Sequence, residues 1–220
     1  MSNLFYNKMS DLILFGMQGS GKGTQARILA DNFNLTIFET GAALRQIAAE
    51  NSELGKKVKA ITEAGHLVPN EIVMDIIEDF LKKISPIQRV LFDGIPRKEE
   101  QRQTFEATLS RSNRQTFAIY LKISREEAFK RLGGRKTCSQ CKEIYGLAYT
   151  EKKCGKCGAE LAIRSDDQNN QSIINRIDVF EKETMPVIEK YREQGRLLEV
   201  DGMPKTEKVT AELLRVVGEQ

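Results

Sequence analysis

A glycine-rich loop that directly follows an apolar run constrains this 220-residue chain more than any other feature. Residues 16–24 read Gly-Met-Gln-Gly-Ser-Gly-Lys-Gly-Thr, and residues 12–15 before them are Leu-Ile-Leu-Phe. The glycines and Lys22 match the phosphate-binding loop, although the usual hydroxyl residue comes one position late, at Thr24. In such a loop, backbone amides and the start of the following helix bind phosphate oxygens. The pattern therefore predicts a strand, a phosphate-binding loop and a helix over residues 24–31.

Apolar runs of strand length recur along the chain and alternate with helical patterns. Strands that alternate with helices form a parallel sheet whose two faces are both covered by helices. Right-handed crossovers then leave the ligand at the carboxyl ends of the strands. We therefore expect an α/β fold with a doubly wound, five-stranded parallel sheet, its strands over residues 12–15, 35–38, 90–92, 117–123 and 197–200.

Two helices can be placed from the pattern of their side chains. Apolar residues at every fourth position predict a helix over residues 71–84, with Asn70 available as its N-cap. A longer helix is predicted over residues 173–192. Pro186 lies inside this second helix, and we expect a kink or a break there because proline lacks a backbone N–H group.

Two segments depart from the alternating pattern. Residues 40–68 are helical and start directly after the second predicted strand, whereas residues 136–164 contain glycines, short polar runs and all four cysteines. Both segments are interpreted as insertions on the ligand side of the sheet. The expected domain division is a core over residues 10–39, 69–133 and 168–220, with insertions at residues 40–68 and 134–167.

The composition is that of an ordinary globular protein, with 40% hydrophobic and 30% charged residues. A formal net charge of +3 gives no argument for a nucleic-acid partner. No apolar run approaches the roughly 20 residues that a membrane span needs, and residues 1–10 lack the apolar core of a signal peptide. We expect a cytoplasmic protein with neither a membrane nor a nucleic-acid partner.

The cysteines lie close together as two C-x₂-C pairs, Cys138 with Cys141 and Cys154 with Cys157. Four thiolates at this spacing are typical of a tetrahedral Zn²⁺ site, and iron is the competing metal. Disulfides are disfavoured in a reducing cytosol. Because four protein ligands leave no position open for water, we expect a structural metal that stabilises a segment without a core of its own.

A second group of residues also points to phosphate chemistry. The predicted strand at residues 90–92 is followed by Asp93, and in phosphate-loop proteins such a carboxylate helps to hold Mg²⁺, directly or through water. A fixed turn, Gly94-Ile95-Pro96-Arg97, comes next. Guanidinium groups bind phosphate in pairs of hydrogen bonds and stay charged in a closed site. The candidate phosphate ligands are Arg45, Arg97, Arg131, Arg135, Arg164 and Arg176.

These segments together resemble the adenylate kinases, specifically the type with a long lid. The resemblance extends from residue 11 to residue 202, over nearly the whole chain. It includes residues 16–26, 40–45, 65–68, 93–97 with Gln101, 131–135, 164–167 and Arg176. A lid with metal-binding cysteines is a known variant within this family, so the resemblance also implies a metal bound by the cysteines. We expect a monomer, because hinged lids need free surface to move.

The resemblance implies reversible, Mg²⁺-dependent transfer of a phosphoryl group from ATP to AMP, which gives two ADP. The implied ATP ligands are Gly19, Ser20, Gly21, Lys22, Gly23, Thr24, Arg131, Arg135, Ile144, Tyr145 and Pro204. The implied AMP ligands are Thr40, Arg45, His66, Leu67, Val68, Gly94, Ile95, Pro96, Arg97, Gln101, Arg164 and Arg176. The implied catalytic residues are Lys22, Arg97, Arg135, Arg164 and Arg176, with Asp93 holding Mg²⁺ through water.

Three positions depart from the family pattern. Ala42 stands where an Asp that organises water around Mg²⁺ is usual, Ile95 stands where Phe is common, and Gly146 replaces a frequent His. We expect an active enzyme with an altered Mg²⁺ dependence. The alternatives are a kinase that acts on UMP or CMP or uses GTP as donor, and a nucleotide-sensing or zinc-ribbon interaction protein without kinase activity.

Overall fold

The computed structural model describes residues 10–164 and 167–218, and its centre is a parallel sheet of five strands. The strands lie in the order β2-β3-β1-β4-β8, and every neighbouring pair is parallel. This confirms the predicted sheet, and each strand lies within a residue or two of its expected position. The strands are β1 (Asp11–Gly16), β2 (Thr36–Glu39), β3 (Val90–Asp93), β4 (Thr116–Lys122) and β8 (Leu197–Asp201).

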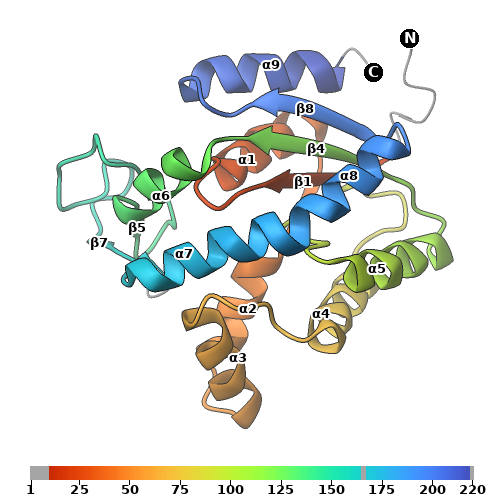
Figure 1. Cartoon of the computed structure of the whole chain (residues 1–220), viewed down its shortest axis with the longest axis horizontal. Helices are drawn as coiled ribbons and strands as arrows, with labels where there is room; N and C mark the ends of the chain where they lie inside the picture. The colour runs from red at the N-terminus through yellow and green to blue at the C-terminus, as the bar shows by residue number, and fades with distance from the viewer. Residues whose placement is uncertain (1–9, 165–166, 219–220) are drawn as a thin grey trace.

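Helices cover both faces of the sheet, because successive side chains of a strand point to opposite sides. Ile13 of β1 packs in one apolar cluster, with residues of α4 (Asn70–Lys83), α5 (Glu99–Arg111), α7 (Asn170–Val179) and α8 (Met185–Glu193). Leu12 and Leu14 pack in the other cluster, with α1 (Lys22–Phe33) and α9 (Thr206–Gly218). Figure 1 shows α9 and α8 on opposite sides of the sheet. The doubly wound arrangement is therefore confirmed.

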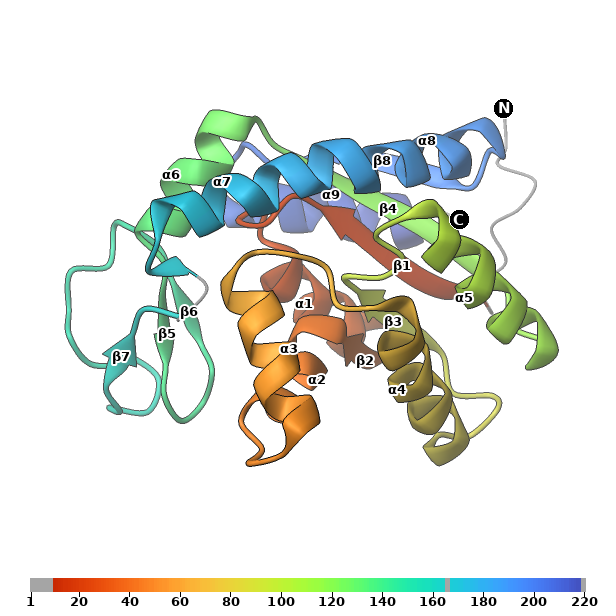
Figure 2. The same ribbon diagram turned by 60° about the horizontal axis from the view of Figure 1, so that its bottom comes forward.

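The two atypical segments form separate lobes, as the two ribbon views show (Figures 1 and 2). Residues 40–68 contain α2 (Thr40–Ala48) and α3 (Glu53–Glu63). The cysteine-rich segment follows α6 (Arg125–Gly133) and forms a small sheet in the order β6-β5-β7. Its strands are β5 (Lys136–Cys138), β6 (Ile144–Tyr145) and β7 (Leu161–Ala162). We call the α2–α3 segment the helical insertion and residues 134–164 the cysteine lobe.

Two details of the helices refine the expectations. Asn70 is the first residue of α4 rather than its N-cap, which is Pro69. The Asn70 side chain instead donates a hydrogen bond to the Thr104 hydroxyl of α5, at 3.1 Å, so it joins two helices. The long C-terminal helix is irregular as predicted, because a π-helical turn (Phe180–Thr184) separates α7 from α8 and ends two residues before Pro186.

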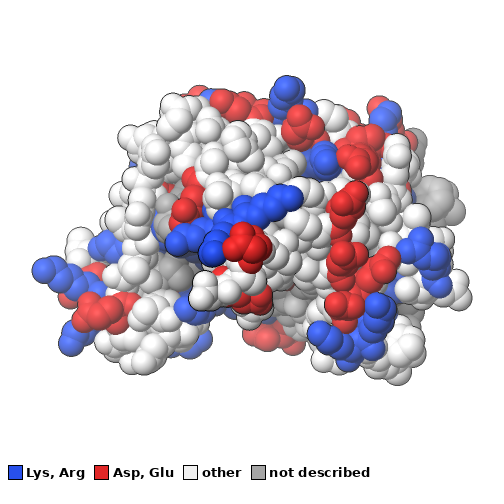
Figure 3. Space-filling model, turned by 90° about the horizontal axis from the view of Figure 1, so that it is seen from below, with Lys and Arg blue, Asp and Glu red and all other residues white. Residues whose placement is uncertain are grey.

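The surface carries charges of both signs. Figure 3, which views the molecule from below, shows a band of basic side chains across the middle with acidic groups beside it and on either flank. Lys56, Lys57 and Lys59 of the helical insertion are exposed, as expected for a solvated helix face. No helix among residues 10–164 and 167–218 combines the length and the apolar character that crossing a membrane requires.

The amino end of β1 is fixed by a buried ion pair that should contribute strongly to stability. The Asp11 carboxylate accepts hydrogen bonds from Arg114 Nε at 2.7 Å and from the Val90 amide at 2.8 Å. Only 3% of the Asp11 side chain and 7% of the Arg114 side chain are exposed. Removing Arg114 would leave the buried Asp11 carboxylate without the cation that is hydrogen-bonded to it.

We therefore expect Arg114→Met to lower the free energy of unfolding by about 3 kcal/mol. Arg111→Met is the matched control, because Arg111 pairs with Glu78 at an exposed position and should cost less than about 1 kcal/mol. Urea denaturation of the three proteins measures both differences. Equal losses in the two variants would show that burial of the Asp11 pair contributes nothing special.

Candidate functional site

The phosphate loop connects β1 to α1, as its sequence predicts. Gly19 and Gly21 adopt φ angles of 85° and 93°, a left-handed conformation that side-chain-bearing residues rarely adopt. The Lys22 ammonium turns back into the loop and donates hydrogen bonds to the carbonyls of Gly16 and Met17, at 2.5 and 3.2 Å. Helix α1 begins at Lys22, two residues earlier than expected, so its positive end faces the loop.

Lys22 lies among several charged groups. Burial lowers the pKa of Lys22 to about 8, the nearby Asp93 carboxylate opposes that shift, and Arg97, Arg135 and Arg176 reinforce it. Asp93 ends β3 and is 7% exposed. Burial raises the pKa of Asp93 above its usual value, against the influence of Lys22. The site is thus rich in cations, and a bound polyphosphate would relieve their mutual repulsion.

The lowered pKa of Lys22 predicts proton uptake when nucleotide binds near pH 8. About half of the Lys22 side chains should be neutral at pH 8 and about a tenth at pH 7. Bound phosphates favour the ammonium form. Titration calorimetry of Mg-ATP in buffers of different ionisation enthalpy should therefore show uptake of about half a proton at pH 8 and little at pH 7.

Lys22→Arg is the control for this measurement, because arginine keeps its charge over the whole range. The linked proton uptake should disappear in that variant. Equal uptake by the two proteins would mean that another group titrates and that Lys22 is already fully charged before ATP binds.

A wide cleft opens between the helical insertion, the β3–α5 turn and α7. The cleft has a volume of about 860 Å³, which includes space open to solvent. Thr40 is 4% exposed, and its hydroxyl has no hydrogen-bond partner among the described residues. Gln101 is 5% exposed, and its Oε1 accepts a hydrogen bond from the Arg97 amide at 2.8 Å. The predicted AMP ligands that line this cleft are Thr40, Arg45, His66, Leu67, Val68, Gly94, Arg97, Gln101 and Arg176.

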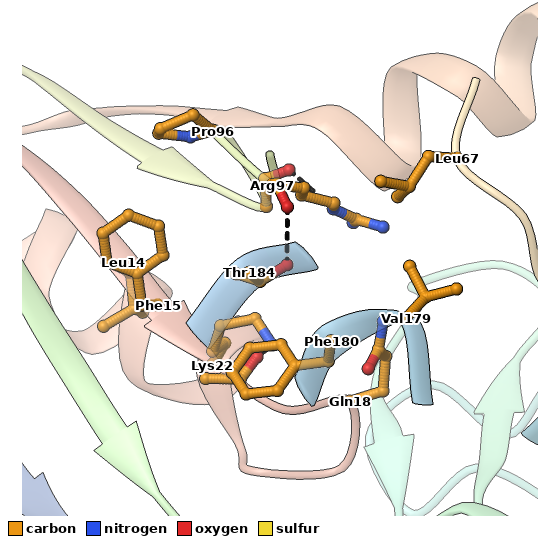
Figure 4. A pocket seen from close by; sticks show the side chains of 12 residues that line it. Leu14, Phe15, Gln18, Lys22, Leu67, Pro96, Arg97, Val179, Phe180 and Thr184 are labelled. Carbon is orange, nitrogen blue, oxygen red and sulfur yellow. Dashed lines mark hydrogen bonds between the residues drawn. The ribbon is translucent and has the colours of Figure 1, made fainter. Parts of the chain in front are cut away.

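A smaller cleft, with about 400 Å³ of space, adjoins the phosphate loop. Lys22, Pro96 and Arg97 line it, and Figure 4 shows the Thr184 hydroxyl bonded to the Arg97 carbonyl, at 2.9 Å. Ile95 is fully buried in the apolar core and lines neither cleft. The structure therefore does not bring Ile95, a predicted AMP ligand, to either cleft.

The predicted arginines are anchored from several elements. Asp167 joins two of them, because its carboxylate accepts from Arg135 Nε and from Arg176 Nη1, each at 2.7 Å. The Asp167 side chain is fully buried, so this bridge holds the start of the cysteine lobe against α7. Arg164 Nε lies 3.2 Å from the Thr137 hydroxyl, inside the lobe.

The remaining arginines lie at the edges of the site. Arg45 pairs with Glu39 at the end of β2, at 2.7 Å. Arg131 donates to the Gly202 and Met203 carbonyls, at 3.1 and 3.3 Å. It thereby connects α6 to the exposed loop after β8, which contains Pro204.

In the cysteine lobe the four sulfur atoms converge. The ligand atoms of Cys138, Cys141, Cys154 and Cys157 all lie within 4.8 Å of one another. The Cys138–Cys157 and Cys141–Cys154 sulfurs are 3.4 and 3.5 Å apart. Four thiolates around one tetrahedral Zn²⁺ lie about 3.8 Å apart, so these residues fit such an ion.

Strand β6 places its two residues on opposite sides. Ile144 faces the phosphate loop, since its Cδ1 lies 4.0 Å from the position of a Cβ built on Gly23. Tyr145 points the other way, and its hydroxyl lies 3.2 Å from the Cys154 sulfur. The structure therefore brings Ile144 to the predicted ATP side and Tyr145 to the cysteines.

Three residues of this site had no role predicted from the sequence. They are Gln18, Glu39 and Thr184, which line the clefts or bond to residues that do. Gln18 lies inside the recognised loop, so its position could have drawn attention to it, whereas the contacts of Glu39 and Thr184 depend on the fold.

Known proteins that are similar to this chain identify its family. The family model for adenylate kinase matches residues 14–196. Curated adenylate kinases of Phytoplasma australiense, Nitrosococcus oceani and Archaeoglobus fulgidus are 38%, 34% and 35% identical to this chain. The alignments cover 94%, 93% and 92% of this chain and 97%, 97% and 95% of those proteins. The phosphate loop, the adjoining clefts and these relatives together show that the chain belongs to the adenylate kinase family.

Proposed function

We propose that this protein transfers a phosphoryl group from ATP to AMP and produces two ADP, with Mg²⁺ bound to ATP. One observation supports this more than any other: two adjoining clefts share lining residues, and one contains Lys22 while the other contains Thr40 and Gln101. The shared residues are Gln18, Leu67, Gly94, Arg97 and Val179. A donor phosphate on the loop and an acceptor in the wide cleft would meet at Arg97. The names of the relatives agree with this activity.

Phosphoryl transfer requires alignment and charge neutralisation rather than covalent help from the protein. In this proposal the loop amides and Lys22 hold the ATP phosphates, and Arg97 and Arg45 hold the AMP phosphate. Arg135, Arg164 and Arg176 neutralise the moving group, since fixed charges act strongly in a dry site. Asp93, a buried carboxylate beside Lys22, suits a water ligand of Mg²⁺, which would neutralise phosphate charge when bound.

The two lobes would then exclude water. We infer that the helical insertion closes over AMP and that the cysteine lobe closes over ATP, as lids commonly do on the μs–ms scale. The Asp167 bridge to Arg135 and Arg176 supports a closed arrangement of the cysteine lobe. We also infer that the enzyme acts as a monomer, which light scattering can test.

Acceptor choice tests this proposal. Thr40 and Gln101 offer a hydroxyl and an amide at the cleft, and these groups suit adenine. With ATP and Mg²⁺, we expect kcat/KM for AMP to exceed that for UMP, CMP and GMP by about 100-fold or more, because polar pockets reject bases that leave them unpaired. The same assay with GTP tests the donor. Faster turnover of UMP or CMP would overturn the adenine assignment.

A further inference from the structure

Gln18 occupies the place where the two clefts meet. It lies in the phosphate loop between Met17, whose carbonyl binds the Lys22 ammonium, and the left-handed Gly19. Its side chain lines both the Lys22 cleft and the wide cleft. In Figure 4 it extends from the loop toward Val179 of α7. A group that passes from one cleft to the other would pass this side chain.

The amide of Gln18 lacks a protein partner for its oxygen. Oε1 is buried and has no hydrogen-bond partner among the described residues. A buried polar atom without a partner costs about 1–3 kcal/mol, so its presence beside a cleft indicates a partner that a ligand supplies. Two hydroxyl oxygens nearby share this property, Ser20 Oγ in the same loop and Thr40 Oγ1 across the wide cleft.

The chemistry of the surroundings indicates the kind of ligand. Lys22, Arg97 and Arg176 line the two clefts, so an anion is favoured at their junction. The oxygen and nitrogen of a glutamine amide exchange places when its terminal torsion turns by about half a revolution. The same side chain can therefore present an N–H group to a phosphate oxygen, and it does so without adding charge.

We propose that the side-chain amide of Gln18 donates a hydrogen bond to the phosphoryl group while that group moves between the two nucleotides. This inference rests on the proposed function. In the step, the bond between the γ-phosphorus and the β–γ bridging oxygen breaks, and the electron pair leaves with ADP. A bond forms between the phosphorus and an oxygen of AMP. Gln18 stays neutral and exchanges no proton, so it stabilises charge that shifts during transfer.

Gln18→Met tests this role, because methionine keeps the length of the side chain but cannot donate. We expect kcat for ADP formation to fall about tenfold, as for loss of a hydrogen bond to a charged group. KM for ATP and for AMP should each change less than about threefold, since the amide acts on the moving group. Gln18→Glu should lower kcat further, by about 100-fold or more, because a carboxylate repels the phosphoryl oxygens.

Thermal unfolding separates this role from a structural one. Gln18→Met removes an unpaired buried oxygen, so its midpoint should equal or exceed that of the wild type. The control is Gln103→Met, since Gln103 is an exposed glutamine on α5 whose side chain bonds to Glu99 at the surface. It should leave kcat, both KM values and the midpoint unchanged.

The possible outcomes distinguish the two proposals. A wild type that forms ADP and a Gln18→Met variant with the same kcat would overturn the role of Gln18 alone. A Gln18→Met variant with a higher KM for AMP and an unchanged kcat would also overturn this role, since the Gln18 amide would then bind AMP before the transfer and not the moving phosphoryl group. A lower midpoint with a proportionate loss of active enzyme would assign Gln18 to structure. A wild type that forms no ADP overturns the proposed function and this inference together.

Discussion

Lys22→Met is expected to lower kcat for ADP formation by about 10³-fold while the protein stays folded. The Lys22 ammonium is held within the phosphate loop by two backbone carbonyls, and three arginines surround it. A methionine of similar length would fill the space but would offer the ATP phosphates no charge. Steady-state assays with saturating ATP and AMP measure the loss, and circular dichroism checks the fold.

Lys208→Met is the matched control, since Lys208 is exposed at the start of α9. We expect it to keep full activity. If Lys22→Met kept full activity as well, the proposed role of the loop lysine in catalysis would be wrong, and the arginines would have to supply the charge without it.

Removal of the metal ion that we expect at the four cysteines is the second change with a large expected effect. Among residues 136–164, the buried residues are Cys138 and Cys154, so the cysteine lobe has almost no apolar core. Its strands are only two or three residues long. A metal bound by four thiolates would therefore supply most of the lobe's stability, as it does in other small metal-binding domains.

We expect one zinc ion per chain, and we expect a chelator or Cys154→Ser to unfold the lobe while the core sheet persists. Limited proteolysis should then cut within residues 136–164 at a much higher rate, and ADP formation should fall at least about tenfold, because an unfolded lobe cannot exclude water. Elemental analysis identifies the metal. If iron is found in place of zinc, the predicted identity of the metal is wrong. If the metal-free lobe resists proteolysis, the metal has no structural role in the lobe.

The core of the fold could be predicted because its signals are local. Each buried strand is a short apolar run, and the loop at residues 16–24 fixes the strand before it and the helix after it. The parallel orientation of the strands follows from the alternation of strands and helices. Pro186 likewise predicted the irregular turn before α8. A proline has no N–H group to bond to the carbonyl one turn earlier, so its effect on the helix is local.

Other features depend on contacts between distant segments. Asparagine is a favourable N-cap residue, yet Asn70 is the first residue of α4 and the Asn70 side chain bonds to Thr104 of α5. Tyr145 and Ile144 are neighbours in sequence, but strand geometry sends them to opposite sides. Asp167 accepts from Arg135 and Arg176, a pairing that becomes visible only when the cysteine lobe meets α7.

The measurement that tests the proposed transfer most directly follows the γ-phosphoryl group itself. ATP labelled in that group is mixed with AMP, Mg²⁺ and the enzyme, and the products are separated. Two ADP should form for each ATP consumed, with the label in the β-phosphate of the ADP that derives from AMP. Label released as inorganic phosphate, or AMP recovered unchanged while ATP is consumed, would contradict transfer between two nucleotides bound at the same time.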